Sequence, residues 1–487
     1  MKYVRISAGD NVGVALSDIK SGEVCGGTEL LNDIPRGHKF ALCDIKSGQD
    51  VIKYAFPIGH AKCDIAAGEH VHTHNVKSNL AGLLEYEYNP VAAKAEPLAA
   101  KTFMGYRRAD GRVGIRNEIW IIPTVGCVNS IGEIIAKKSE PRGSVDGIYA
   151  FTHPYGCSQL GGDHEMTKRA LAGLVNHPNA AGVLVLALGC ENNTVEQMKE
   201  AIGGYDENRV RFLVSQDVED EISEGVRIVG ELIDAAKDSR REEIPASELV
   251  IGLKCGGSDG LSGITANPLV GRFSDMLCGM GGTTILTEVP EMFGAETLLM
   301  NRCKNRELFE KTVKMINDFK SYYMRYGEKI DENPSPGNKE GGITTLEDKA
   351  LGCTQKGGLS EVCGVLDYGE PVSVKGLNLL TAPGNDLVAS TALAVSGAHI
   401  VLFTTGRGTP FGCPVPTAKI STNTALYAKK RAWIDFDAGV LVTNGFDMEA
   451  TAEDFFDYIL SVASGEKTAT EKQDIRDIAI FKDGVTL

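Results

Sequence analysis

Residues 118–125 read EIWIIPTV, and three further apolar runs follow: GIYAFTH (147–153), GVLVLAL (182–188) and VRFLVS (210–215). Each run has the length of a buried strand and is followed by a longer segment typical of a helix. Strands that alternate with helices predict a parallel sheet covered on both faces. We therefore expect an α/β unit here, and the rest of the chain extends outward from it.

Towards the C-terminus the same pattern starts again, with LVIGLKC (249–255), TTILTEV (283–289), LNLLTAP (377–383) and HIVLFTT (399–405). This predicts a second α/β unit with its own parallel sheet. Residues 327–346 form a long polar loop inside that unit. Loops of this length in a compact domain are usually functional or mobile.

The N-terminal segment carries an internal repeat of the form A-x-x-D-I-x-x-G, which begins at Ala15, Ala41 and Ala61. Asp and Gly beside short apolar runs predict strand–turn–strand units. We predict a small β domain and a multidomain α/β protein, divided as follows: 1–80 β domain, 81–105 linker, 106–242 middle α/β domain and 243–487 C-terminal α/β catalytic domain.

The composition is that of an ordinary globular enzyme, with 43% hydrophobic and 24% charged residues among 487. The formal net charge of -15 disfavours nucleic acid and anionic membranes as partners. No apolar run reaches the ~20 residues that span a bilayer. The first residues lack the apolar core of an export signal, so we expect a cytoplasmic protein.

Four predicted strands end close to a cysteine: Cys127, Cys157, Cys190 and Cys255. The carboxyl ends of parallel strands are where such sheets bind ligands. These thiols could therefore ligate a metal or an iron–sulfur cluster. Cysteine is also a small residue that fits tight turns, and the sequence leaves both interpretations open.

Three histidines alternate in GEHVHTHN: His70, His72 and His74. On a strand, this spacing would place the three imidazoles on one face. Neutral imidazole is a common ligand of divalent transition metals. We predict that His72 and His74, with His70, contact a metal; a solvated histidine tract is the alternative.

Gly-rich polar loops follow the later strands and precede helices, whose N-termini bind anions. Arg407 is the leading candidate for gripping a carboxylate, because its planar fork matches one. No loop matches a nucleotide-binding fingerprint in the right context, so we expect no nucleotide. Capped turns are the alternative interpretation of each loop. The other predicted substrate-binding residues are Ser258, Ser262, Thr265, Asn267 and Asn385.

Several of these motifs together resemble the altronate/galactarate dehydratase family: GEHVHTHN, TVGCVN, YGCSQLGGDH, LGCENN, CGGSDGLSGITANP, APGNDLVA and TGRGTPFG. The resemblance covers nearly the whole chain. RGHKFAL, VIKYAFPIGHA and WIDFDAG are closer to the altronate members. The resemblance implies an N-terminal SAF domain of the β-clip type, a dimerising middle domain and a Rossmann-like C-terminal domain. It further implies iron dependence (Fe²⁺, with Mn²⁺ as the alternative), a homodimer and a site near the SAF and C-terminal domains.

The implied reaction is dehydration of the sugar acid D-altronate to 2-dehydro-3-deoxy-D-gluconate in hexuronate catabolism. Such a dehydration needs a general base, a general acid and stabilisation of charge on the carboxylate. We place Lys356, Lys254 and Asp259 as the acid/base candidates. Three alternatives stay open: galactarate or a sulfo-acid as substrate, an iron–sulfur mechanism at the four cysteines, and a sugar-acid-binding module without catalysis.

Overall fold

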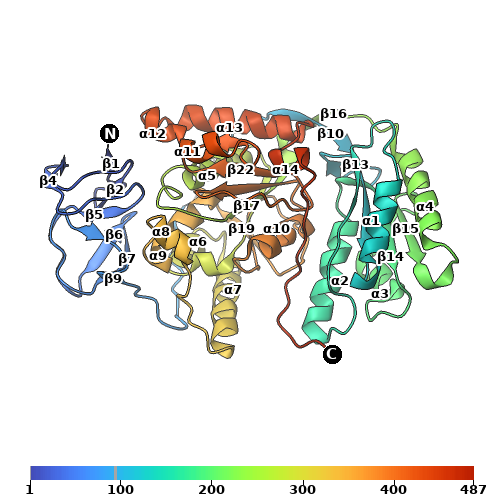
Figure 1. Ribbon diagram of the computed structural model, residues 1–487, viewed down its shortest axis with the longest axis horizontal. Coiled ribbons are helices and arrows are strands. Elements are labelled where there is room, and N and C mark those ends of the chain that lie inside the picture. The colour runs from blue at the N-terminus through green and yellow to red at the C-terminus, as the bar shows by residue number, and fades with distance from the viewer. Residues whose placement is uncertain (1, 93–95) are drawn as a thin grey trace.

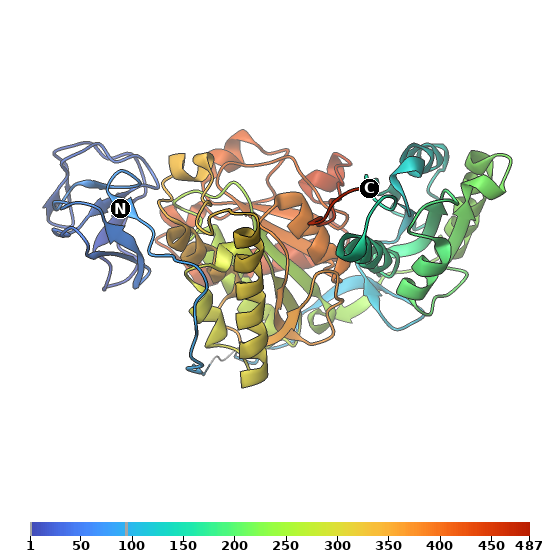
Figure 2. The same ribbon diagram turned by 90° about the horizontal axis from the view of Figure 1, so that it is seen from below.

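The computed structural model describes residues 2–92 and 96–487, and it arranges them as three bodies in a row (Figures 1 and 2). The N-terminal β domain lies at one end and the middle domain at the other. The C-terminal domain, although last in the sequence, lies between them. Part of the predicted linker, residues 93–95, lies outside the described residues.

The N-terminal domain is built from short strands, as its repeat predicts. Each repeat makes the same turn, because Gly22, Gly48 and Gly68 have φ angles of 84°, 83° and 84°. Glycine adopts these positive φ angles without strain. The strands are β1 Tyr3–Val4, β2 Val12–Ala15, β3 Val24–Cys25, β4 Thr28–Glu29, β5 Lys39–Ala41, β6 Asp50–Lys53, β7 Phe56–Ala61, β8 His70–Val71 and β9 Val76–Lys77.

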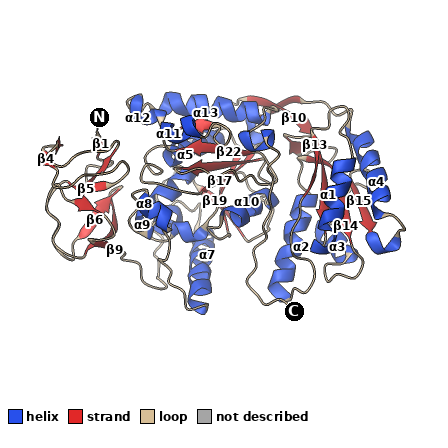
Figure 3. Cartoon of the chain, in the orientation of Figure 1, coloured by secondary structure: helices blue, strands red, loops and turns tan. Residues whose placement is uncertain are grey.

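The middle domain holds a four-stranded parallel sheet in the order β13-β12-β14-β15 (Figure 3). All four strands fall on the apolar runs that predict them, and the helices follow the strands. The strands are β12 Glu118–Pro123, β13 Gly147–Ala150, β14 Ala180–Ala187 and β15 Val210–Val214. The helices are α1 Asn129–Lys138, α2 Gly161–Val175, α3 Val195–Ile202 and α4 Glu221–Ala236.

The C-terminal domain holds a seven-stranded sheet in the order β19-β20-β18-β17-β21-β22-β23, parallel throughout. β19, β22 and β23 are absent from the sequence prediction, because they are short or carry polar residues within the strand. The strands are β17 Val250–Cys255, β18 Thr283–Leu286, β19 Val362–Leu366, β20 Gly376–Leu380, β21 Ile400–Thr405, β22 Thr417–Ser421 and β23 Phe436–Asp437.

Helices cover both faces of this sheet (Figure 1). They are α5 Ala266–Gly279, α6 Glu296–Met300, α7 Arg306–Arg325, α8 Pro336–Glu340, α9 Leu346–Cys353, α10 Asp386–Val395, α11 Thr424–Lys429, α12 Val440–Thr443, α13 Met448–Ala463 and α14 Ala469–Lys472. No helix within residues 2–92 and 96–487 is long and apolar enough to cross a membrane.

The middle and C-terminal domains share one apolar core, in which Leu171 and Leu174 of α2 pack with Leu393 and Val395 of α10. A small antiparallel sheet also joins them. Its strands are β10 Thr102–Arg107, β11 Val113–Gly114 and β16 Glu242–Pro245. β10 begins inside the segment that the sequence predicts to be a linker. In that part of the strand Phe103 and Gly105 are buried, whereas Thr102 and Met104 are exposed.

Candidate active site

The carboxyl edge of the seven-stranded sheet has the topology of a ligand site. The chain runs from β17 through β18 to β20 on one side, then crosses to β21 on the other side of β17. Ligands of open parallel sheets bind at such a switch point. The charged edge, as we call it, consists of Lys254, Cys255, Glu288, Glu291, Lys349, Cys353, Lys356 and Asp386.

Lys254 lies near the end of β17, fully buried, and connects two carboxylates. Its Nζ donates a hydrogen bond of 2.6 Å to Asp386 Oδ1 and lies 3.1 Å from Glu288 Oε1. Burial alone would lower the pKa of Lys254, but the two carboxylates raise it to about 12. This ammonium group is therefore charged at neutral pH.

Glu288 is a buried acid held in an uncommon backbone conformation. Its φ angle is 70°, in the left-handed region that non-glycine residues rarely occupy. Glu288 Oε2 accepts a hydrogen bond of 2.9 Å from the backbone N–H of Cys255. Burial, with the nearby charge of Glu291, raises the pKa of Glu288 well above its ordinary value. A strained residue with a shifted pKa at a strand end is typical of an active site.

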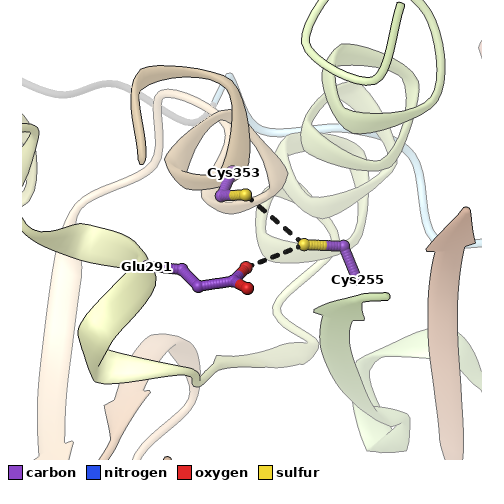
Figure 4. A group of neighbouring side chains, drawn as sticks. All are labelled: Cys255, Glu291 and Cys353. Atoms are coloured by element: carbon purple, nitrogen blue, oxygen red, sulfur yellow. Dashed lines mark hydrogen bonds between the residues drawn. The ribbon is translucent and has the colours of Figure 1, made fainter. Parts of the chain in front are cut away.

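A buried group of two thiols and one carboxylate lies beside Glu288 (Figure 4). Cys255 Sγ lies 3.4 Å from Cys353 Sγ and 3.0 Å from Glu291 Oε2. Lys356 Nζ donates to Cys255 Sγ at 2.9 Å, and Lys349 Nζ lies 2.7 Å from Glu291 Oε1. The hydrogen bond from Cys353, together with the two ammonium groups, lowers the pKa of Cys255 to about 6, against burial and the charge of Glu291, which raise it.

This group does not fit a divalent cation, although its three ligand atoms lie within 4.8 Å of one another. The ammonium groups of Lys356 and Lys349 already neutralise the Cys255 thiolate and the Glu291 carboxylate. A buried cation placed there would meet two like charges, which is costly. We therefore describe these residues as a paired charge network.

The histidines of the N-terminal domain face the C-terminal domain. His38 Nε2 lies 3.1 Å from the carbonyl oxygen of Glu340, and His72 Nδ1 lies 3.2 Å from Thr344 Oγ1. His38 Nδ1 lies 3.1 Å from His70 Nε2. The segment that contacts these histidines is thus the long polar loop, residues 327–346.

The expectation that three imidazoles share one strand face is wrong. β8 contains only His70 and Val71, and a turn carries His72 and His74. The ring centre of His70 lies 5.7 Å from that of His72 and 5.5 Å from that of His74, so the three histidines still form a cluster. Asn75 closes the turn by accepting from the His72 N–H at 2.9 Å, a local bond that competes with the strand.

The donor chemistry of this histidine cluster fits a transition metal. Burial, followed by the charges of neighbouring groups, lowers the pKa of His70 to about 4 and that of His72 to about 3. Both rings are therefore neutral at neutral pH, the form that binds metals. Their nitrogen atoms do not converge: in the described part of the chain, only the Cys255 group brings three ligand atoms within 4.8 Å.

A buried ion triad joins the N-terminal domain to α9, and sequence inspection missed it. Asp348 accepts from Lys39 Nζ at 2.8 Å and from Lys53 Nζ at 2.9 Å. All three side chains are at most 2% exposed. A cavity of only about 10 Å³ remains nearby, lined in part by Lys53, Ser258 and Asp259.

The predicted anion-binding residues have mixed placements. Arg407 lies half-exposed, with its Nη2 3.1 Å from Glu340 Oε2, close to the histidine-facing loop. Asp259 is partly buried and accepts from Ser262 Oγ at 3.2 Å and Thr422 Oγ1 at 2.9 Å. The hydroxyl of Ser258 is buried and has no partner in the described residues.

Three other predicted residues use their polar atoms structurally. Thr265 donates to the carbonyl of Thr422 at 2.8 Å. Asn267 donates to the carbonyl of Gly352 at 3.0 Å and is fully buried. Asn385 caps α10. The sequence analysis does not name Glu288 or Asp386 as site residues. The signals that could have found them are the motifs TEVPE and APGND, which lie at the ends of predicted strands.

The four-cysteine set separates in space, so Cys255 cannot ligate one centre together with the other three cysteines. Cys127, Cys157 and Cys190 follow strands of the middle sheet and are exposed. Cys255 belongs to the seven-stranded sheet, is buried, and contacts Cys353 and Lys356 instead. Equivalent positions along two sheets are not neighbours when the sheets belong to different domains.

The topology and the charged edge define the class of this protein as a multidomain α/β enzyme with its site outside parallel strand ends. Three family models match in order. They are the altronate/galactarate dehydratase SAF domain (residues 1–79), the second domain of D-galactarate dehydratase/altronate hydrolase (105–237) and the D-galactarate/altronate dehydratase C-terminal domain (246–486). The chain belongs to the D-galactarate/altronate dehydratase family, which confirms the resemblance and the multidomain α/β fold.

Relatives within the family differ in their sequence identity to this chain. Altronate dehydratases of Bacillus subtilis and Escherichia coli are each 54% identical over the full chain and at least 99% of their own length. A galactarate dehydratase (L-threo-forming) of Escherichia coli is 34% identical over 97% of the chain and 94% of its own length. The alpha subunit of a (2R)-sulfolactate sulfo-lyase of Chromohalobacter salexigens is 37% identical over only 16% of the chain and 93% of its own length.

Proposed function

We propose that this protein is a hydro-lyase that removes water from D-altronate to give 2-dehydro-3-deoxy-D-gluconate. The observation that carries the proposal is the 54% identity to two altronate dehydratases, against 34% to the galactarate dehydratase. The similarity to the altronate dehydratases extends over the whole chain, so it includes both sides of the junction between the N-terminal and C-terminal domains.

The charged edge supplies groups suited to the two proton transfers. We assign the general base that takes the C2 proton to Glu288, because its raised pKa makes its carboxylate form a stronger base than an ordinary carboxylate, and the charge of Lys254 beside it favours that form. We assign the general acid at the C3 hydroxyl to Lys254, which is charged and adjacent. Lys356 acts through Cys255, so its role is to position the network.

The junction supplies the groups that would hold the substrate's carboxylate. Arg407 offers a planar donor fork beside the histidine-facing loop. We propose that His72 and His74, with His70, hold Fe²⁺ or Mn²⁺, because imidazoles suit these ions and those of His70 and His72 are neutral at neutral pH. Their nitrogen atoms would have to move closer together to bind one ion. Bound there, the metal would stabilise negative charge on the substrate. The homodimer stays a prediction that light scattering would measure.

The decisive experiment incubates the purified protein separately with D-altronate, galactarate and sulfolactate, with and without ferrous iron, and identifies each product by NMR. We expect turnover of D-altronate, its loss with a chelator, and its recovery with iron better than with magnesium. Preference for galactarate or sulfolactate would replace the substrate assignment. Full activity after metal removal would remove the metal from the proposal.

The histidine assignment has a matched control in the same domain. We expect the double variant His72→Ala/His74→Ala to lose turnover while it stays folded by circular dichroism. His60 lies on β7 of the same domain, where it contacts Asn79 instead of the C-terminal domain. His60→Ala should keep turnover. Equal activity of both variants would leave the histidine cluster without a catalytic role.

A further inference from the structure

Each exposed cysteine at the carboxyl edge of the middle sheet follows a glycine. The pairs are Gly126–Cys127 after β12, Gly156–Cys157 after β13 and Gly189–Cys190 after β14. These three strands are direct neighbours in the order β13-β12-β14. We call the three cysteines the thiol edge; the charged edge and the proposed dehydration do not use them.

The glycines let the loops of the thiol edge pack against each other. A Cβ atom on Gly156 would lie 2.0 Å from the carbonyl oxygen of Thr124, and one on Gly126 would lie 2.8 Å from that of His153. Backbone hydrogen bonds join the same loops. Gly126 N–H donates to the Tyr155 carbonyl at 2.9 Å, and Asn193 N–H donates to the Gly156 carbonyl at 3.0 Å. The three cysteines therefore belong to one interlocked group of loops.

Two buried amides in these loops have polar atoms without a partner in the described part of the chain. Gln159 is 3% exposed and accepts from the Gly156 N–H at 3.1 Å through Oε1, which leaves its Nε2 donor unpaired beside the Gly156–Cys157 turn. Asn193 is fully buried; its Nδ2 donates to the Thr124 carbonyl at 3.1 Å, and its Oδ1 is unpaired. Buried polar groups are normally paired, so unpaired ones point to a ligand.

A donor to sulfur is already present at the third cysteine. Gln216 Nε2 donates to Cys190 Sγ at 3.5 Å. Amide N–H groups directed at sulfur are a common feature around thiolate-bound metal centres, because they stabilise the negative charge on sulfur. Exposed thiols, interlocked loops and available N–H donors thus occur together at one edge of the sheet.

As they are placed, the three sulfur atoms do not suit a single ion. Zinc, with bonds of about 2.3 Å to each thiolate, draws its sulfurs to about 3.8 Å of one another. The three sulfurs of the thiol edge are not all within 4.8 Å of each other, because among the described residues only the Cys255 group meets that limit. An iron–sulfur cluster binds each thiolate to a different iron and so accepts a wider spacing.

We propose that the thiol edge holds an iron–sulfur cluster of the [4Fe–4S] type through Cys127, Cys157 and Cys190. Each thiol loses its proton and bonds to one iron, which leaves the fourth iron without a protein thiolate. The Gln159 amide donates a hydrogen bond to the cluster, as Gln216 does to Cys190. Cys255 takes no part, since it lies in another domain. The site is separate from the histidine cluster, at the opposite end of the row of domains (Figures 1 and 2).

The test compares two sets of serine substitutions in the full-length protein, purified without oxygen from iron-replete cells. Iron, zinc and acid-labile sulfide are measured per protein molecule, with the visible absorption spectrum. The control is Cys43→Ser/Cys63→Ser, which removes two exposed thiols of the N-terminal domain. We expect about five irons per molecule, one of them at the histidines, and about four sulfides in the unchanged and control proteins. Cys127→Ser/Cys157→Ser/Cys190→Ser should lose the sulfide and about four of the irons.

Two results would overturn the inference: iron and sulfide that stay equal in the triple variant and the control, or zinc without labile sulfide. Circular dichroism checks that the triple variant is folded. If the triple variant is unfolded, the three single serine variants are measured instead, and each should lose sulfide. The outcome is independent of the dehydration assignment. A His72→Ala/His74→Ala protein should keep its sulfide while it loses turnover, so failure of one proposal is distinguishable from failure of the other.

Discussion

The two parallel sheets of this protein share an architecture but differ at the edge where their strands end. The charged edge of the C-terminal sheet is buried and paired, with Lys254 between Glu288 and Asp386. The thiol edge of the middle sheet is exposed. The N-terminal domain packs beside the charged edge, where Lys39 pairs with Asp348 of α9 and His38 contacts the carbonyl oxygen of Glu340. Covering an edge with a second domain strengthens the electrostatic interactions inside it.

The largest effect is expected from removing the central charge of the covered edge. Lys254→Gln keeps most of the length of the side chain but cannot transfer a proton, so kcat/KM for D-altronate should fall by about 10²–10⁴-fold. Lys375→Gln is the matched control, since Lys375 pairs with Glu248 on the surface. Steady-state kinetics on folded protein measures both. Near-normal turnover of the Lys254 variant would move the chemistry away from this edge.

The next effect concerns the ion triad that docks the covering domain. Asp348→Asn would leave Lys39 and Lys53 buried without a counter-charge, so we expect a loss of about 3–5 kcal/mol in the free energy of unfolding. The exposed pair Lys46–Asp64 lies in the same domain as these lysines. Asp64→Asn should cost much less, because water and salt screen an exposed pair. Urea unfolding, followed by circular dichroism, measures the free energy of unfolding of both variants. Similar decreases in the two variants would show that the triad does not stabilise the contact between the domains.

A smaller effect is the pH dependence of the covered junction. The folded pKa values of His70 and His72, about 4 and about 3, lie below the ordinary value of 6.5. The unfolded protein therefore binds protons on these rings at a higher pH than the folded protein. Stability should be complete above about pH 6.5 and should fall as the pH drops towards 4.

A double variant isolates the histidine contribution to that pH dependence. His70→Asn/His72→Asn should flatten the fall in the free energy of unfolding between about pH 6.5 and about pH 5, whereas His60→Asn should leave it unchanged. Urea unfolding at several pH values is the measurement. An unchanged slope in the double variant would show that other groups cause the acid sensitivity.

The smallest effect is expected at the rim of the covered edge. Arg407→Lys keeps the positive charge but loses the planar fork, so KM for D-altronate should rise about two- to tenfold with kcat little changed. Arg431, which is exposed, provides the control Arg431→Lys. A fall in kcat without a change in KM would show that Arg407 acts on the transition state instead of holding the substrate.

The sequence by itself determined the local elements and the chemistry that each one carries. The apolar runs at 118–125 and 182–188 predict β12 and β14, because burial on both faces requires continuous apolar residues. The Ala-x-x-Asp-Ile-x-x-Gly repeat predicts the turns at Gly22, Gly48 and Gly68, since the backbone needs a positive φ angle there. The long motifs were sufficient to identify the family.

Only the tertiary structure decided which of these groups meet. Cys255 follows the same strand-end pattern as Cys127, yet it pairs with Cys353, which lies 98 residues further along the sequence. The Lys39–Asp348 pair joins residues 309 apart. Neither pairing leaves a periodic signal, because periodicity records which side of an element is buried and not what covers it. The packing of one domain against another selects those partners, and here it made one strand edge a closed charge network and left the other open.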